Sequence, residues 1–467
     1  MAINIETSNG ELFDDVLSDA DLELLRRLDS LYEGADKVAL KKLSKNDRSW
    51  AWPQPESHQA GFYVPIEFRG YFFPADQDLL TRVDKPHILQ ASIRARWPGF
   101  SEHPIAMSYR RFTNKASEAH FTVPPKAAFA NIGPASFVIL GRKCDDAGIF
   151  FDCLTIDSGS AAYEVVERQF EILPSFLVGV FEPPKKDTVP ESIADEIDVL
   201  IDQFVDAAKD GRLPQLIEQY RKIPESSFIN SLAQSQWLAD DPQRSFDPFT
   251  LSNPGNILRQ LTTEIEFTIY RSYELRFRAA QALEIIFRGG VAPTTTQIVQ
   301  RVVRHFIPLY QVMLDASQQR RTRVGAGFES HIRRMLQAGR IPYEEQAVVS
   351  TRRPDFVLPT KNLYMNKSSD ALVLAAKTTL RERWKQVPME QRNCTVFLAT
   401  MDEKVTRSAV KEMANLQITL VVPESFKSKG TIIEYAKESN VLTFKQFFSE
   451  EIAVRRRARW LELGLWC

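Results

Sequence analysis

The pattern of apolar and polar positions changes several times along the 467-residue chain. Residues 11–33 place apolar side chains at helical spacing, so we predict one or two helices there. From residue 58 to residue 183, short runs rich in β-branched and aromatic residues are separated by Pro, Gly, Asp or Asn, which is typical of strands and turns. These runs are GFYVP, HILQASI, HFTVP, SFVILG and GIFFDCLTI, and the stretch AAYEVVERQFEIL indicates a helix after them.

The second half of the chain has a different periodicity. Residues 181–192 concentrate proline and charge and are the best candidate for a linker, and residues 193–317 follow helical spacing. From residue 323 helices and strands alternate, which predicts a sheet with helices on its faces. The expected order is helix FESHIRRMLQAG, strands EEQAVV, DFVLP and ALVLAA, a helix from about Thr379, strand CTVFLAT, helix VTRSAVKEMANL and strand ITLVVP.

Composition limits the classes of protein that these elements can form. Hydrophobic residues make up 44% and charged residues 25%, which is usual for a globular protein and excludes disorder along the whole chain. The formal charge of −1 does not indicate a nucleic-acid binder, so any basic surface must be local. The four cysteines form no CxxC pair and the six histidines are scattered, which argues against a zinc site.

The N-terminal residues and the lengths of the apolar runs indicate the cellular compartment of the protein. The acidic, polar N-terminus does not resemble a signal peptide, and no run of 18 apolar residues predicts a membrane helix. We therefore expect a cytoplasmic protein with free thiols and no membrane partner.

The most informative block is residues 351–390. Pro354-Asp355 opens one predicted strand, Lys377 ends the next, and Glu390 lies on the following predicted helix. A carboxylate at the start of a strand and a lysine at the end of its hairpin partner can meet at one end of a sheet. Phosphodiester cleavage with Mg²⁺ needs oxygen ligands of this kind, and Asp355, Glu390 and the carbonyl of Ala376 can supply them. Lys377 can position or deprotonate the attacking water.

The same residues have a purely structural interpretation. Asp355 can cap a turn after Pro354, and Lys377 can be an exposed end of a strand, because such spacings often arise by chance. The triplet Arg381-Glu382-Arg383 is chemically suited to reading G·C pairs, since Arg pairs with guanine and Glu accepts from cytosine in the major groove. A solvated helical face is the alternative.

At these residues the chain resembles the EcoRII-type restriction endonucleases, whose nuclease core has the PD-(D/E)XK fold and which cut CC(A/T)GG and related CCNGG or CCGG sites. The resemblance covers about residues 320–435, and its most characteristic strings appear here as RPDF and KTTLRERWKQ. The other matching stretches are RVGAGFESHIRRML, IPYEEQAVVSTRRPDFVLPT, LVLAAKTTLRERWKQV and ITLVVPESF.

The resemblance implies roles for individual residues of the C-terminal part. Asp355, Lys377 and Glu390 are the implied catalytic set, with Asp355 and Glu390 as Mg²⁺ ligands. One departure is Ala375, which stands where the general nuclease motif has an acid two residues before the lysine. In this group a carboxylate from the next helix replaces it, although Pro388 can bend that helix near Glu390.

Further implied roles concern DNA contacts and the first helix of the core. Arg381, Glu382 and Arg383 are the implied readers of the CC:GG half-site. Arg323 is expected near the central base pair, and Glu329 either supports the metal site or forms a surface salt bridge. Tyr364 aligns with a tyrosine of the family, and burial is its alternative interpretation.

The N-terminal part resembles the β pseudobarrel that this family shares with plant transcription-factor domains. Through residues 41–65 the resemblance implies that His58 and Tyr63 face DNA. It implies the same for the basic, amide-bearing stretch that we predict to be a loop between strands, with a solvated hairpin loop as the alternative. The residues expected to bind DNA in that stretch are Arg110, Arg111, Asn114 and Lys115.

Two more basic stretches are candidates for phosphate contacts. Residues 318–323 precede the first core helix, and residues 455–459 form a basic tail. Cations of this kind give salt-dependent affinity for DNA. A solvated helix face is the commoner meaning of the tail.

Together these observations predict a multidomain α+β protein. Residues 1–183 form a β pseudobarrel that binds effector DNA, residues 184–235 form linker and helices, and residues 236–467 form an α/β nuclease domain with a helical dimerisation part. The expected function is that of a prokaryotic type II restriction endonuclease that uses Mg²⁺, cuts double-stranded DNA as a homodimer and binds a second site as allosteric effector. A cognate DNA methyltransferase is expected in the host.

Two alternatives stay open at this point. One is a DNA-binding protein with a degenerate nuclease domain that does not cut, and retention of Asp355, Lys377 and Glu390 together argues against it. The other is a repair nuclease that recognises DNA structure, and the triplet Arg381-Glu382-Arg383 argues against that.

Overall fold

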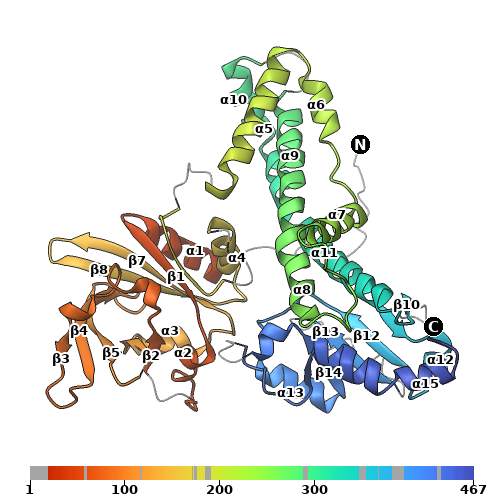
Figure 1. Ribbon diagram of the computed structural model, residues 1–467. Helices are drawn as coiled ribbons and strands as arrows, with labels where there is room; N and C mark the ends of the chain where they lie inside the picture. The colour runs from red at the N-terminus through yellow and green to blue at the C-terminus, as the bar shows by residue number, and fades with distance from the viewer. Residues whose placement is uncertain are drawn as a thin grey trace, which may run out of the picture. The chain divides into compact units, whose positions relative to one another are not determined.

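The computed structural model describes most of the chain in two compact units, residues 1–188 and residues 189–467 (Figure 1). Side chains of residues 168, 191–194, 310–311 and 313–322 are not described. The described residues are 19–56, 60–115, 118–170, 172, 176–184, 191–287, 293–345, 354–366, 368–380, 394–428 and 433–466.

The first unit is built on one mixed, mainly antiparallel sheet. Its strand order is β2-β6-β5-β4-β8-β7-β1-β9, with β3 beside β4, and β4 and β8 are parallel neighbours. The strands are β1 (Lys37–Lys42), β2 (Gly61–Tyr63), β3 (Leu80–Thr81), β4 (Ile88–Arg96), β5 (Ile105–Phe112), β6 (Glu118–Thr122), β7 (Phe137–Asp145), β8 (Gly148–Ile156) and β9 (Val178–Phe181). The helices are α1 (Asp19–Tyr32), α2 (Lys45–Ser49), α3 (Lys126–Ala130) and α4 (Ala161–Gln169).

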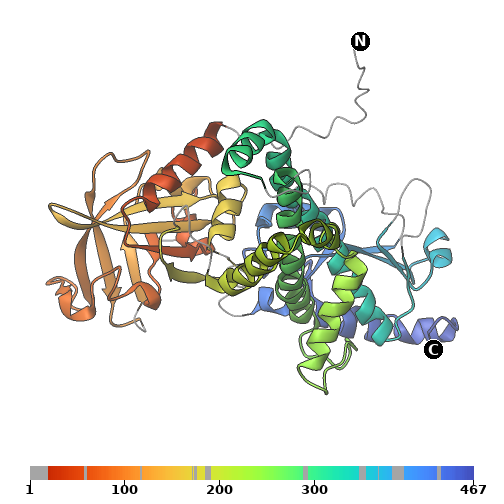
Figure 2. The same ribbon diagram turned by 90° about the horizontal axis from the view of Figure 1, so that it is seen from above.

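Both faces of strands β1 and β7 are covered. Helices α1 and α4 pack on one face, where Phe137 stacks on Tyr163 with ring centroids 4.3 Å apart. On the other face Val138 and Leu140 join a cluster rich in phenylalanine. Coverage on both sides explains why β7 begins with the continuous apolar run FVIL instead of an alternating one. Figures 1 and 2 show α1 and α4 beside β1 and β7.

The second unit combines long helices with a smaller mixed sheet. Its strand order is β10-β11-β12-β13-β14-β15, in which β10, β11 and β12 are antiparallel neighbours and β12 to β15 run parallel. The strands are β10 (Glu344–Glu345), β11 (Phe356–Leu358), β12 (Leu372–Ala376), β13 (Thr395–Ala399), β14 (Ile418–Val422) and β15 (Val441–Thr443).

The helices of this unit cover both faces of that sheet. One face packs on α8, α11 and the C-terminal helices, and the other packs on α13. Strand β12 is buried throughout, with Leu374 on the first face and Ala375 on the second. The helices are α5 (Glu191–Lys209), α6 (Leu213–Gln219), α7 (Ser226–Ala239), α8 (Pro254–Gln260), the π-helical turn η3 (Leu261–Ile265), α9 (Glu266–Ile286), α10 (Thr295–Arg304), α11 (Phe306–Ala338), α12 (Lys361–Met365), α13 (Arg407–Asn415), α14 (Phe444–Gln446), the π-helical η6 (Phe447–Val454) and α15 (Arg457–Glu462).

The observed elements confirm the mixed α+β class and most of the predicted strands. One expectation about local structure was wrong. Arg110 and Arg111 lie in strand β5 and not in a loop, and among the described residues the turn is formed by residues 113–115. The helix predicted over FESHIRRMLQAG is confirmed as the last part of α11, which begins at Phe306. Residues 377–380 are not helical, and the rest of the helix expected from about Thr379 lies outside the described residues.

Among the described segments, no helix is long and apolar enough to cross a membrane.

The boundary between the two compact units falls between residues 188 and 189. Helices α5, α6 and α7 therefore belong to the same unit as the second sheet. The predicted three-part boundaries stay a prediction.

Candidate active site and nucleic-acid interface

Asp355 and Lys377 meet at one end of the second sheet. Asp355 comes directly before β11 and Lys377 directly after β12, and these strands are antiparallel neighbours, so the two residues share a sheet edge. Asp355 Oδ2 accepts hydrogen bonds from Lys377 Nζ at 2.9 Å and from the Ala376 N–H at 2.8 Å. The lysine side chain is 37% exposed and the aspartate side chain 15% exposed. The carboxylate is therefore held in place while the lysine reaches solvent.

Glu329 on α11 adds a second carboxylate to this edge. The neighbouring Phe328 and Ile332 are fully buried in the same core cluster as Phe356, the residue after Asp355. Burial raises the pKa of Glu329, and the charge of Asp355 raises it further, while Lys377 lowers it. A carboxyl group whose pKa is raised by burial and by a second carboxylate is typical of a place that a cation would stabilise.

These residues fit a divalent metal in the chemistry of their donors. Asp355 and Glu329 offer carboxylate oxygens, and both described hydrogen bonds to Asp355 end on Oδ2, which leaves its Oδ1 for a ligand. Within the part of the chain that the structure describes, no three Asp, Glu, His or Cys side chains group as a ready-made metal site. Glu390, the second predicted ligand, and the predicted readers Arg381, Glu382 and Arg383 lie outside the described residues.

Asp402, which the sequence analysis missed, anchors the chain just after Lys377. It is 7% exposed, and its carboxylate accepts the N–H of Leu380 at 2.7 Å and the N–H of Lys404 at 2.9 Å. Burial raises the pKa of Asp402, although these backbone donors favour the charged form. The N–H of Lys377 donates to the Ala399 carbonyl at 2.9 Å. The segment 377–380 is thus tied to the end of β13 at both of its ends.

Other predicted residues of the second unit have protein partners. Arg323 donates to the Pro224 carbonyl at 2.5 Å and its guanidinium lies 4.9 Å from the centre of the Tyr270 ring. Tyr364 is 7% exposed and packs with Val357 and Val373, as its burial alternative expected.

The basic tail is paired within the unit. Arg455 and Arg456 form ion pairs with Glu451 at 2.7 and 2.8 Å, and Arg459 pairs with Asp370 at 3.4 Å. These pairs match the structural alternative for the tail. The side chains of residues 318–322, which make up most of the other basic stretch, are not described.

In the first unit, a polar row crosses the sheet at Tyr63 and Arg110. Tyr63 on β2 stands opposite His120 on β6, and His120 stands opposite Arg110 on β5. Tyr63 is 39% exposed. Arg111 is the next residue of β5, so its side chain points to the other face, where it pairs with Asp76. The two arginines that were predicted together are therefore separated by the sheet.

The remaining predicted residues of this unit are only partly covered. Asn114 and Lys115 are exposed in the turn after β5, and Lys115 Nζ lies 5.4 Å from the centre of the Phe112 ring. His58 lies outside the described residues. The structure thus brings Tyr63 and Arg110 onto one face and leaves the turn residues in solvent.

A buried ion pair between Lys41 and Asp47, which the sequence analysis missed, holds the backbone at Tyr63. Lys41 Nζ donates to Asp47 Oδ2 at 2.5 Å, and the Tyr63 N–H donates to Asp47 Oδ1 at 2.7 Å. Burial disfavours the charged forms of both Lys41 and Asp47. Lys41 and the other hydrogen-bond donors to Asp47 nevertheless hold the pKa of Asp47 below its ordinary value. The pair fixes the backbone of β2 where Tyr63 emerges.

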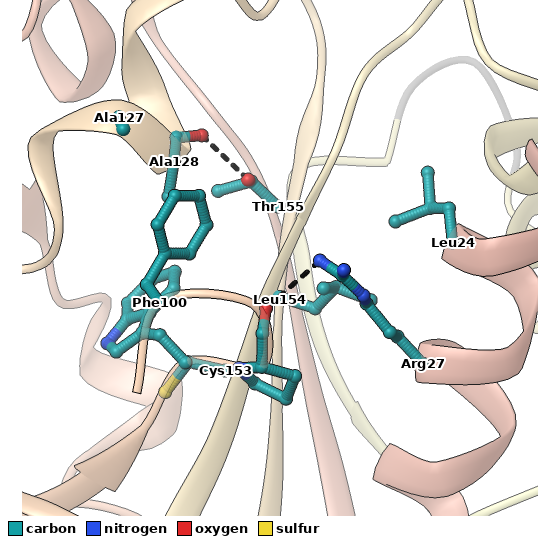
Figure 3. Close-up of a pocket in the computed structure, with 10 residues that line it drawn as sticks. Leu24, Arg27, Phe100, Ala127, Ala128, Cys153, Leu154 and Thr155 are labelled. Carbon is teal, nitrogen blue, oxygen red and sulfur yellow. Dashed lines mark hydrogen bonds between the residues drawn. The ribbon is translucent and has the colours of Figure 1, made fainter. Parts of the chain in front are cut away.

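A pocket of about 230 Å³ also lies in the first unit (Figure 3). Arg27 of α1 reaches over it and donates to the Pro98 carbonyl at 3.3 Å, while Thr155 of β8 donates to the Ala128 carbonyl at 2.7 Å. None of the predicted DNA-contacting residues that the structure describes lines this pocket. It is therefore separate from the candidate interface.

Comparison with known proteins supports a nuclease assignment for the second unit. Residues 284–448 match the family described as EcoRII C terminal. The chain is 26% identical over 161 residues to the type II restriction enzyme SsoII of Shigella sonnei, which covers 32% of this chain and 52% of that enzyme. It is 24% identical over 428 residues to the type II restriction enzyme EcoRII of Escherichia coli, which covers 88% of this chain and 93% of that one.

These matches show that the chain is homologous to type II restriction enzymes. The chain spans about half the length of SsoII and nearly all of EcoRII. A solved structure of metal-depleted Ecl18kI in complex with uncleaved, modified DNA is 21% identical and has a TM-score of 0.43, covering 52% of this chain and 84% of that chain.

Proposed function

We propose that this chain is a type II restriction endonuclease that cleaves double-stranded DNA with Mg²⁺. The observation that carries the proposal is the hydrogen-bonded pair of Asp355 and Lys377 at one sheet edge. This pair lies inside the segment 284–448 that matches the EcoRII C-terminal family. Homology to SsoII and EcoRII supports the same activity.

In the proposed mechanism the protein binds the metal and orients the water. Asp355 and Glu390 would hold Mg²⁺, with Glu329 as a further carboxylate at the same edge. When bound, Mg²⁺ would supply Lewis-acid chemistry that polarises the scissile phosphate and lowers the pKa of the attacking water. Asp355 accepts a hydrogen bond from Lys377 Nζ, which keeps the ammonium at the sheet edge. From there the Lys377 ammonium orients the water by donating a hydrogen bond and offsets negative charge in the transition state.

We propose that sequence recognition lies beside this site. Arg381, Glu382 and Arg383 follow the anchored segment 377–380 and read the G·C pairs of a CC(A/T)GG, CCNGG or CCGG site. Arg323 contacts the centre of the site or the DNA backbone. Two copies of the chain, related by the twofold symmetry of the site, supply one active site to each strand.

We propose that the first unit binds a second copy of the site as allosteric effector. Tyr63 and Arg110, which share one face of the sheet, form part of this surface. Asn114 and Lys115 extend it along the exposed turn, and His58 belongs to it by resemblance. Arg111 was expected there too, and its ion pair with Asp76 must open before it can bind DNA.

The experiment that tests this function uses the full chain, Mg²⁺ and plasmids that carry none, one or several candidate sites. Discrete fragments whose mapped ends fall at CC–GG sequences are the expected result. Faster cleavage of plasmids with several sites is expected from the effector role. Tight binding without any cleavage would refute the nuclease assignment and favour the non-cutting alternative.

A further inference from the structure

A chain of hydrogen-bonded polar side chains joins three helices of the second unit. Gln234 lies on α7, Glu266 begins α9 and His331 lies on α11. His331 is completely buried and Glu266 is 5% exposed. His331 Nε2 lies 3.2 Å from Glu266 Oε2, and His331 Nδ1 lies 3.0 Å from Gln234 Nε2.

The hydrogen-bonding capacity of these groups defines how the network is connected. The amide nitrogen of Gln234 can only donate, so Nδ1 of His331 accepts and its Nε2–H donates to Glu266. Both ring nitrogens of a fully buried histidine are thereby satisfied, as burial of polar groups requires. Removing one partner would leave the others unpaired in the protein interior.

Two glycines on α11 show how closely Glu266 approaches that helix. A Cβ atom at Gly327 would overlap the carboxylate of Glu266, whereas a Cβ atom at Gly325 would meet no atom within 4 Å. Glycine is unfavourable inside a helix because it loses more backbone entropy than alanine. At position 327 the missing Cβ atom leaves space for the Glu266 carboxylate, so glycine has a structural reason there. At position 325 no neighbouring atom requires a glycine.

The same turn of α11 carries Glu329 toward the candidate active site. Gly327 and His331 flank Glu329 at two residues on either side, and an α-helix has 3.6 residues per turn. Phe328 and Ile332 pack in one buried cluster with Phe356 and Ala376, the residues next to Asp355 and Lys377. The polar network and this apolar cluster contact α11 on different sides and so fix its rotation about the helix axis. A rotation of the helix would move Glu329 relative to Asp355.

We propose that the Gln234–Glu266–His331 network, seated against Gly327, fixes the rotation of α11 and holds Glu329 beside Asp355 for metal binding. Glu266 and His331 are positioning residues, since they touch neither DNA nor metal in this role. The inference rests on the proposed nuclease function, because it gives Glu329 a task at the metal site.

Two variants of the full chain disturb the network, and two controls match them. Glu266→Gln keeps the size of the side chain but removes its charge, and Gly327→Ala displaces the carboxylate. Gly325→Ala is the same substitution in the same helix without the overlap. Glu451→Gln removes another buried, ion-paired glutamate of this unit, which is 6% exposed.

The measurements are Mn²⁺ binding by electron paramagnetic resonance, the Mg²⁺ concentration for half-maximal cleavage, and the thermal midpoint. We expect Glu266→Gln and Gly327→Ala to weaken Mn²⁺ binding about tenfold, the low end of the range for residues that support metal ligands. The half-maximal Mg²⁺ concentration rises in parallel. Gly325→Ala and Glu451→Gln keep the metal affinity of the unmodified chain, although the thermal midpoint of Glu451→Gln falls.

Two results would overturn the inference. One is a loss of thermal stability in Glu266→Gln with unchanged metal affinity, which would make the network purely structural. The other is an equal loss of metal affinity in Gly325→Ala and Gly327→Ala. If Gly327→Ala does not fold, Glu266→Gln still decides. If the unmodified chain cuts no DNA but Glu266→Gln weakens Mn²⁺ binding, the proposed function fails and the positioning role stands.

Discussion

Replacing Asp355 with Asn separates the catalytic role of this carboxylate from its structural role. The substitution keeps the size of the side chain and removes the charge that faces Lys377 at 2.9 Å. The lysine is 37% exposed, so solvent screens the ion pair and its contribution to stability is at most about 1 kcal/mol. The hydrogen bond from Ala376 contributes about 1 kcal/mol more. We expect the free energy of unfolding to fall by about 1–2 kcal/mol.

The effect on cleavage is expected to be much larger. The amide introduced by Asp355→Asn would be a poorer metal ligand than the carboxylate and would no longer hold the Lys377 ammonium by charge, so two contributions to transition-state stabilisation are weakened together. Loss of a single electrostatic contact of this kind costs about 10²–10³ in rate. We therefore expect Asp355→Asn to lower the cleavage rate by at least about 10³-fold, or roughly 4 kcal/mol.

The assay compares Asp355→Asn with Asp370→Asn in the full chain. Asp370 lies before the start of the same strand, β12, and pairs with Arg459 at 3.4 Å, so its substitution makes the same change of charge far from Lys377 along the strand. Cleavage is followed in Mg²⁺, DNA binding in the absence of divalent metal, and unfolding in urea. Asp370→Asn should cut normally, and both variants should bind DNA. Cleavage by Asp355→Asn within about tenfold of the unmodified rate, or an equal loss in Asp370→Asn, would refute the reasoning.

Four further outcomes are expected from single substitutions. Lys377→Met should lower cleavage about 10²–10³-fold and leave metal-free DNA binding intact, measured by single-turnover cleavage and gel shift. Because the pKa of Glu329 is raised, a proton should compete with Mg²⁺ as the pH falls, so the half-saturating Mg²⁺ concentration should rise at low pH in the unmodified chain and less in Glu329→Gln. Burial raises the folded-state pKa of Asp402, so the folded chain binds a proton more tightly at this residue than the unfolded chain. The free energy of unfolding should therefore fall as the pH rises from the ordinary pKa of aspartate through the raised one. Urea titrations of Asp402→Asn should lack this dependence on pH. Arg110→Ala should weaken binding of DNA to the first unit by about 1–3 kcal/mol if Arg110 reads a base, seen as lost stimulation of cleavage by a second site.

Local patterns in the sequence were sufficient for the centre of the candidate site. Asp355 and Lys377 belong to two strands that are neighbours both in sequence and in space, so their order along the chain already placed them at one sheet edge. Continuous apolar runs marked β7 and β12 because both faces of these strands are buried. In these cases the residues whose contacts decide the structure lie close together in the sequence, so a short stretch of sequence is enough to predict it.

Strands β1 and β5 were missed for a physical reason. In β1 a lysine, Lys41, is buried and compensated by Asp47, so the strand does not look apolar from its letters. In β5 the inward position 111 is an arginine that pairs with Asp76, which makes the segment resemble a polar loop. Compensation by a partner elsewhere in the chain hides burial from any local pattern.

The supporting parts of the site were decided by tertiary structure alone. The sequence contained Glu329 as a candidate but could not decide between a metal site and a surface salt bridge, and the packing of α11 brings it near Asp355. The contacts of Asp402 with Leu380 and of His331 with Glu266 join residues that are far apart along the chain. Helical periodicity predicts that a face will be buried, but it does not say which helix will cover it. That choice depends on the packing of the whole unit, where a buried polar group is stable only beside its partner.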